Sequence, residues 1–250
     1  MRVAYDGAQF SGFARNDDVT TVQGELEATL ATVLRHPVAV ACAGRTDRGV
    51  HSRGQVVSFD ADAGHFEPVA LQRAVNRMLR PAVVVDEVEA TTEEFDARLS
   101  CIGRTYRYHV LNRPVPDPLL DPLTWHVREP LDVGAMQLAA ERIVGGHDFS
   151  AFSKRNKSRP TESFFRRVRS ADWWRDGELV RFEVTANAFT HQMVRSLVGM
   201  FVEIGRGRRG VDDLAAALDA TGRDAVPSPA PPRGLVFWRA HYEVGSAPAP

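Results

Sequence analysis

The alternation of apolar and polar positions along this 250-residue chain predicts short strands separated by amphipathic helices. In the first helical stretch, Val22, Leu26 and Leu30 recur every four residues, and Pro37 follows its end. Further segments with helical spacing are residues 67–79, 133–145, 191–205 and 211–220. Alternating or continuously apolar runs predict strands at residues 1–7, 38–43, 55–59, 83–90, 104–112, 166–177, 178–188 and 235–244.

The order of these elements predicts an α+β fold with a mainly antiparallel sheet covered by helices. They fall into two similar halves, residues 1–100 and 101–245, followed by a flexible tail at 246–250. Proline-rich stretches at 112–122 and 227–234 are predicted to be loops. A hydrophobic content of 44% and a charged content of 25% are typical of a globular protein with a substantial core.

The formal net charge of −1 does not by itself indicate a nucleic-acid binder. Basic residues nevertheless concentrate between Lys154 and Arg169, where Glu162 is the only acidic residue. A solvated loop would explain this run as well as a basic face would. Cys42 and Cys101 form no metal-binding spacing. No apolar stretch is long enough to span a bilayer, so we expect a cytoplasmic protein without membrane contact.

The most distinctive segment is AGRTDRGVHSRGQVVSF, which spans residues 43–59. In it Asp47 is flanked by Arg45 and Arg48, and such cations favour an ionised carboxylate. Its glycines allow the backbone to bend closely around a ligand. A carboxylate in such a loop can serve as nucleophile, base or metal ligand. Composition alone favours a plain solvated turn in which Asp47 pairs with a neighbouring arginine.

The order of the residues adds a more specific indication. The pattern GRTDxGVHxxGQVxxF, from Gly44 to Phe59, resembles the signature of the tRNA pseudouridine synthase A family. The YDG motif at Tyr5 and the PAPPRGLVFW segment near the C-terminus resemble the same family, although Phe13 stands where the family usually has tryptophan. The resemblance implies the pseudouridine synthase fold, with a central RNA-binding cleft and Asp47 as the catalytic residue.

A second candidate residue is Arg195, in the strongly apolar helix predicted at 191–205. A buried arginine needs an anionic partner, whereas one at the helix surface can extend its charge into solvent. The pattern leaves both open. The segment FTHQMVRSLVG resembles the family motif F-x-x-x-M-V-R-x-x-V-G, which implies that Arg195 forms an ion pair with Asp47.

Tyr106 and Tyr108 alternate on one face of the strand predicted at 104–112. Either could be ordinary packing, or a stacking platform for a base that has been flipped out of an RNA stem. The resemblance to the family pattern K/R-x-Y-R-Y implies that Tyr106 lies against the target base. It also implies that Arg45 guides the flipped nucleotide.

The basic segment follows a run that looks like the HDF-S-x-F region of the family. Basic side chains bind phosphates without regard to sequence, so the resemblance implies an RNA-facing role for this segment. Its phenylalanines are predicted to belong to the core. The basic residues expected to face RNA are Lys154, Arg155, Lys157 and Arg159.

Together these features predict an isomerase that converts uridine to pseudouridine at positions 38, 39 and 40 of the tRNA anticodon stem-loop. The family resemblance also implies a homodimer. The reaction involves no redox change, so we expect no nicotinamide or flavin cofactor. The sequence carries no cluster of metal ligands, so we expect no metal. Three alternatives remain open: a synthase for another RNA, an RNA-binding module in which Asp47 only organises a turn, and a metal-dependent hydrolase using Asp47, His51 and His191.

Overall fold

The computed structural model describes residues 1–61, 67–155, 161, 163–220 and 222–243. The chain forms two compact units. The first contains Met1–Arg104 and the chain from Val236 onward, and the second contains Thr105–Leu235. The last strand belongs to the first unit because it pairs with a strand there, whereas the sequence pattern placed it in the second half. The predicted tail, residues 246–250, lies outside the described residues.

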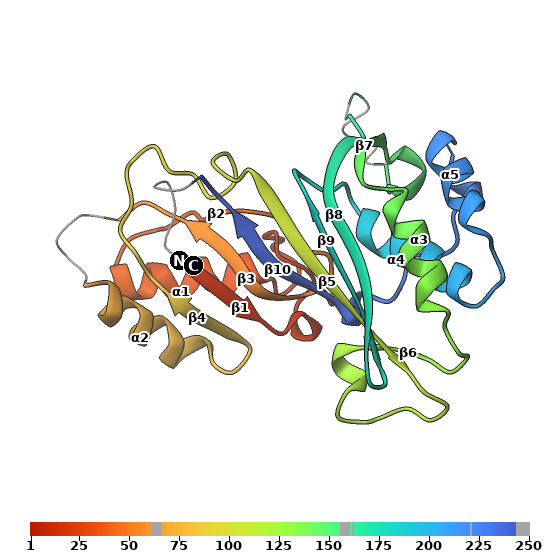
Figure 1. Cartoon of the computed structure of the whole chain (residues 1–250). Helices are drawn as coiled ribbons and strands as arrows, with labels where there is room; N and C mark the ends of the chain where they lie inside the picture. The colour runs from red at the N-terminus through yellow and green to blue at the C-terminus, as the bar shows by residue number, and fades with distance from the viewer. Residues whose placement is uncertain (62–66, 156–160, 162, 221, 244–250) are drawn as a thin grey trace. The chain divides into compact units, whose positions relative to one another are not determined.

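Both units combine helices with strands, as the sequence predicts (Figure 1). The α-helices of the described residues are α1 (Val22–Leu34), α2 (Pro68–Leu79), α3 (Val133–Glu141), α4 (Met193–Gly205) and α5 (Val211–Asp219). The strands are β1 (Arg2–Tyr5), β2 (Ala41–Cys42), β3 (His51–Ser58), β4 (Val83–Glu87), β5 (Gly103–Asn112), β6 (Trp125–Val127), β7 (Gly145–Asp148), β8 (Phe165–Asp176), β9 (Leu179–Ala186) and β10 (Leu235–His241). Within the described residues, no helix is long and apolar enough to cross a membrane.

In the first unit the strands follow the order β4-β1-β3-β10. Strand β1 is antiparallel to both β3 and β4, β2 is antiparallel to β3, and β10 runs parallel to β3. Helix α1 begins at the predicted position because Thr21 caps it by accepting a hydrogen bond from the Gly24 amide. Its apolar face packs with that of α2 against β1 and β4, where Leu26, Leu30 and Val75 are fully buried (Figure 1).

In the second unit the order is β5-β9-β8-β7, and β6 runs parallel to β5. Strands β8 and β9 form the predicted hairpin, which turns at Gly177 with a positive φ of 60°. Helix α3 packs on both β8 and α4. The core includes Trp173, whose ring stacks on Phe182 at a centroid distance of 4.8 Å and meets the edge of Phe201 at 5.9 Å.

Three local predictions need correction. The helix predicted at 133–145 ends at Glu141, and the Gly145–Gly146 pair begins β7, which pairs with β8. A side chain at Gly146 would come within 2.6 Å of the Phe165 ring, which packs there beside the glycine. Strand β3 begins at His51 instead of Gln55. The apolar run at 38–43 contributes only the two residues of β2, although Val40 and Ala43 on either side of them are buried.

Candidate active site

Asp47 lies in the loop between β2 and β3, as the sequence predicts. Its side chain is half-buried, the neighbouring Arg45 and Arg48 are exposed, and Thr46 is buried. The Asp47 carbonyl accepts a hydrogen bond from the Val50 amide at 3.1 Å, which closes a four-residue turn. Gly49, at the third position of the turn, has a φ of 78° that few other residues adopt. The loop therefore carries a carboxylate between two exposed cations on a defined turn.

The start of this loop is attached to its surroundings by two side chains. Gln55 forms two hydrogen bonds with the Gly44 peptide group, one from its Nε2 to the carbonyl at 2.6 Å and one to its Oε1 from the amide at 3.3 Å. The Nε and Nη2 atoms of Arg104 both donate to the carbonyl of Ala43, at 2.9 and 2.8 Å. Since Gln55 is fully buried, these bonds hold residues 43 and 44 against the sheet.

The middle of the loop is attached through Thr46. Its carbonyl accepts a hydrogen bond from the Phe13 amide at 3.0 Å, and its hydroxyl is 2.8 Å from the Tyr5 hydroxyl. Gly12 has a φ of 112°, and a side chain there would come within 3.1 Å of the Thr46 carbonyl. Burial raises the pKa of Tyr5 above its ordinary value of 10.0, an effect that the Thr46 hydrogen bond partly offsets. The phenol is therefore neutral at physiological pH.

His51 follows the loop and is buried, with 4% of its surface exposed. Its Nδ1 atom lies 3.2 Å from the Gly7 amide, which donates to it, and 3.1 Å from Asp6 Oδ1. These contacts attach His51, the first residue of β3, to the segment that follows β1. Among the described residues, no group of three or more His, Cys, Asp or Glu side chains could hold a metal ion. This leaves the hydrolase alternative without a ligand set in that part of the chain.

The two tyrosines of β5 lie in the second unit. Tyr108 is fully buried, and its hydroxyl donates to the Pro231 carbonyl at 2.8 Å, so it has a structural role. Tyr106 is 8% exposed, and its ring meets that of Phe189 edge-on at a centroid distance of 5.0 Å. The alternation along the strand gave no reason to prefer one tyrosine over the other. The structure shows that their partners differ, a backbone carbonyl for Tyr108 and an aromatic ring for Tyr106.

Arg195 is half-buried on the first turn of α4. Its Nε donates to the Ala230 carbonyl at 2.7 Å, and the Ala230 amide donates to the Arg195 carbonyl at 2.9 Å. Burial raises the pKa of Tyr108, and the positive charge of Arg195 partly offsets this rise. Both residues belong to the second unit. The ion pair between Arg195 and Asp47 stays a prediction.

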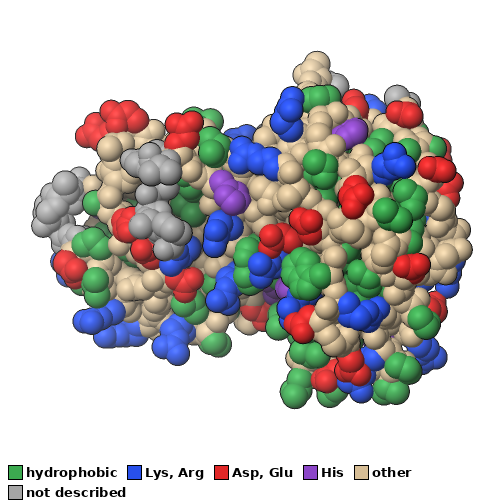
Figure 2. Space-filling view, in the orientation of Figure 1, with side chains coloured by type: hydrophobic (Ala, Val, Ile, Leu, Met, Phe, Trp, Pro, Cys, Tyr) green, Lys and Arg blue, Asp and Glu red, His purple; other side chains and the backbone are tan. Residues whose placement is uncertain are grey.

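Lys154 and Arg155 are exposed, as expected for residues that face RNA. The guanidinium of Arg155 lies over the Phe164 ring, 5.3 Å from its centroid, and the Lys154 amide donates to the His191 carbonyl at 2.9 Å. The other two predicted RNA-facing residues, Lys157 and Arg159, lie outside the described residues. On the face drawn in Figure 2, basic and acidic side chains are interspersed, in keeping with the net charge of −1.

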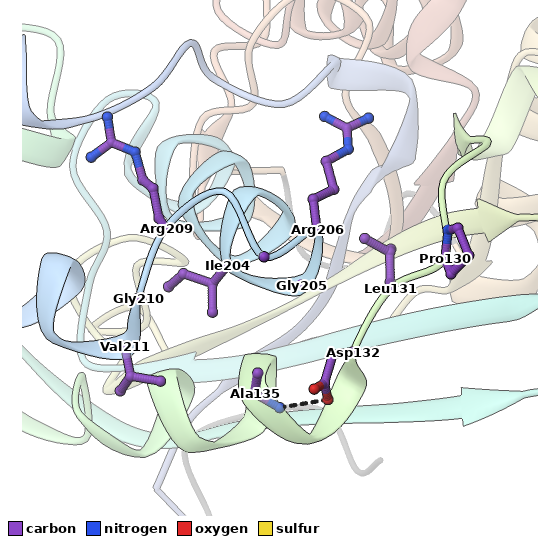
Figure 3. A pocket seen from close by; sticks show the side chains of 11 residues that line it. Pro130, Leu131, Asp132, Ala135, Ile204, Gly205, Arg206, Arg209, Gly210 and Val211 are labelled. Carbon is purple, nitrogen blue, oxygen red and sulfur yellow. Dashed lines mark hydrogen bonds between the residues drawn. The ribbon is translucent and has the colours of Figure 1, made fainter.

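A pocket of about 650 Å³ lies within the second unit, where α4 ends and α5 begins (Figure 3). Leu131, Ile204 and Val211 line it together with Arg206 and Arg209. Arg206 also donates to the Glu203 carboxylate at 2.7 Å and to that of Glu129 at 3.2 Å, so acidic partners offset its charge. None of the predicted site residues lines this pocket, and we do not assign the uridine to it.

Comparison with known proteins decides between the alternatives. The family model described as tRNA pseudouridine synthase matches residues 1–99 and 139–243. The chain belongs to the tRNA pseudouridine synthase family. Proteins named tRNA pseudouridine synthase A are 38% identical in Halalkalibacterium halodurans, over 98% of this chain and 92% of that protein, and 40% identical in Bradyrhizobium sp., over 97% and 98%. A Cbf5-Nop10-Gar1 complex gives a TM-score of 0.32 at 14% identity, over 82% of this chain and 55% of that chain, a likeness too weak to inform the fold.

Membership of this family confirms the predicted fold class, and it makes the chain a tRNA pseudouridine synthase, an isomerase. The side chains that hold the Asp47 loop in place were not predicted from the sequence: Tyr5 and Gln55 occur only as letters of the motifs that carry the resemblance, and Arg104 was not singled out.

Proposed function

We propose that this synthase isomerises uridine to pseudouridine at positions 38, 39 and 40 of the tRNA anticodon stem-loop, with Asp47 as the catalytic carboxylate. The observation that carries the proposal is the near full-length similarity to proteins named tRNA pseudouridine synthase A, together with the unbroken Asp47 motif. The exposed Arg45 and Arg48 beside Asp47 support it, since they can attract the phosphates around a target nucleotide.

The chemistry breaks the bond between N1 of uracil and the anomeric carbon of ribose, and forms a bond from C5 of uracil to the same carbon. Asp47 acts either as a nucleophile or as a base. Three routes each conserve atoms and electrons: attack at the anomeric carbon, attack on the uracil ring, and proton abstraction leading to a glycal. In the dissociative routes uracil leaves as an anion, rotates in the site and rejoins the sugar. The hydrogen that C5 loses is balanced by the one that N1 gains.

The target uridine lies in a stem or loop and has to be extruded first, which costs a few kcal/mol. In the proposal, Tyr106 stacks on the extruded base and Arg45 holds its nucleotide. Arg195 forms an ion pair with Asp47, which keeps the carboxylate charged and oriented. Contacts from Lys154, Arg155, Lys157 and Arg159 to phosphates offset the cost of extrusion.

The test uses purified protein, a tRNA transcript and mapping of pseudouridine at single-nucleotide resolution. We expect Asp47→Ala and Asp47→Asn to lower kcat at least about a thousandfold while tRNA binding is retained. Asp18→Asn, which alters an exposed carboxylate of the same unit, serves as the matched control. Unchanged modification by the Asp47 variants would remove this residue from the mechanism.

The same assay tests the ion pair. Arg195→Ala should lower kcat about a hundredfold with little change in tRNA affinity, and Arg195→Lys should recover part of the loss. Loss of binding with turnover intact would instead make Arg195 a phosphate contact. Pseudouridine at sites outside the anticodon stem-loop, with none at 38, 39 and 40, would refute the proposed positions.

The proposal extends to assembly and location. We propose a homodimer with RNA lying across both subunits, and a cytoplasmic protein, as the family resemblance implies. Sedimentation of the protein with and without an anticodon stem-loop tests the first point, and a sedimenting species of monomer mass at micromolar concentration would refute it. Cell fractionation tests the second.

A further inference from the structure

The hydroxyl of Tyr5 is buried at the end of β1, next to the loop that carries Asp47. Tyr5 is 5% exposed, and its ring packs against Phe13 at a centroid distance of 6.2 Å. A phenylalanine would provide the same apolar contact without placing a hydroxyl out of reach of water, which is costly unless it is hydrogen-bonded. The hydroxyl lies 2.8 Å from that of Thr46 and also interacts with the side chains of Gln55 and Ser52. Of these three residues, Thr46 is the one adjacent to Asp47 in the chain.

Thr46 directly precedes Asp47 and is 7% exposed. The loop around them has no strand or helix to fix it, and its backbone is held by separate bonds at Gly44, Thr46 and Val50. The Thr46 side chain is attached by the bond to Tyr5, which reaches across 41 positions of the chain to β1, a strand that lies between β4 and β3. A rotation of the Thr46 side chain would be coupled to the backbone of Asp47 through the single peptide that joins them.

We infer that Tyr5 is a positioning residue for Asp47, acting through the hydroxyl of Thr46. The inference rests on the proposed role of Asp47 and adds a residue that does not touch the substrate. Catalytic groups have to be held within about 0.5 Å of their productive position by neighbours that are themselves fixed by packing. Tyr5 meets this condition because β3 and β4 pair with it from both sides, at Ser52 and Val83.

The decisive variant is Tyr5→Phe, which removes one oxygen and keeps the ring. With enzyme in excess over tRNA, we expect the single-turnover rate of pseudouridine formation to fall about three- to tenfold, the range of one neutral hydrogen bond. The affinity for tRNA should stay within about twofold, because no phosphate contact is lost. A merely structural tyrosine would lower the melting temperature without this selective loss of rate.

Tyr242→Phe provides the matched control. Tyr242 also belongs to the first unit, and its hydroxyl donates to the Ala97 carbonyl at 2.7 Å, outside the Asp47 loop. This variant deletes the same atom and should keep the wild-type rate. Equal losses of rate in the two variants, or a wild-type rate in Tyr5→Phe, would overturn the inference.

Variants of Thr46 give a second test that does not depend on the Tyr5 variant folding. Thr46→Val should reproduce the loss of rate, Thr46→Ser should retain most of the rate, and the double variant Tyr5→Phe/Thr46→Val should be no slower than either single variant. Losses that multiply in the double variant would show that the two hydroxyls act independently, which would refute the inference.

These assays distinguish a failure of the proposed function from a failure of the positioning role of Tyr5. If the wild-type protein forms no pseudouridine in tRNA, or Asp47→Ala remains active, the proposed function fails. If the wild type is active, Asp47→Ala is inactive and Tyr5→Phe is as fast as the wild type, only the positioning role fails.

Discussion

Replacing Arg104 with methionine should loosen the start of the Asp47 loop and lower the stability of the first unit. The guanidinium donates to the carbonyls of Ala43, Cys101 and Arg98, the last two at 3.0 and 3.2 Å. Methionine keeps the apolar stem of the side chain but removes all of these donors. The change therefore isolates the hydrogen bonds from the packing.

The expected magnitude follows from the burial of the carbonyl-bearing residues. Ala43 is 2% and Cys101 8% exposed, so their carbonyls lose donors where water has little access. Each such loss costs about 1–3 kcal/mol, and the exposed Arg98 carbonyl can turn to water. A total of about 3 kcal/mol corresponds to a fall of about 6–12 °C in melting temperature for a chain of this length.

Differential scanning calorimetry checks the stability, and the single-turnover assay checks the loop. Arg104→Lys should lie between the wild type and the methionine variant, because one ammonium group cannot reach all three carbonyls. Arg113→Met is the control: its partner Glu178 is exposed, and such surface pairs contribute about 0–1 kcal/mol. A melting temperature for Arg104→Met that matches the Arg113→Met value would refute the reasoning.

The remaining predictions concern groups whose pKa is raised by burial. Burial raises the pKa of Tyr5 and of Tyr108 above the ordinary 10.0, so the folded state holds these protons more tightly than the unfolded state. Their contribution is fully present below pH 10 and is lost as the pH rises above it; a midpoint of urea unfolding that stays constant from pH 8 to 11 would contradict this. Burial also raises the pKa of the Cys42 thiol to about 11, an effect only partly offset by Arg45. At pH 7.5 iodoacetamide should therefore alkylate Cys42 about a hundredfold more slowly in the folded protein than in guanidinium, as followed by mass spectrometry; equal rates would show that the thiol is not shielded.

Much of the fold follows from local patterns. Helix α1 lies where Val22, Leu26 and Leu30 place it, because its cap and its apolar spacing are both encoded within a few residues. Strand β7 does not follow from local patterns, since the need for Gly146 arises from the Phe165 ring, which comes 19 positions later and packs across the ladder. Two adjacent glycines are typical of a turn, and nothing in the neighbouring sequence shows that the Phe165 ring packs beside them.

The candidate site likewise has one part that the sequence predicts and one part that it does not. Asp47 and its turn could be predicted because the glycines and cations that define them are adjacent in sequence. The attachments to Tyr5 and Arg104 could not, because a hydrogen bond between positions 41 or 61 residues apart leaves no periodic trace. The roles of Arg195 and Tyr106 rest on resemblance, and the Arg195 variants described above test the first of them.

The parallel pairing of β10 with β3 constrains the order in which the two units can fold during synthesis. Residues 105–235 form a continuous segment, so the second unit can fold as soon as the ribosome has released it. The first unit has to wait, because Val236 and Phe237 complete the edge beside His51 and Ser52. During synthesis the strand that follows the Asp47 turn therefore keeps an open edge, a hazard for aggregation that ends only when the last strand arrives.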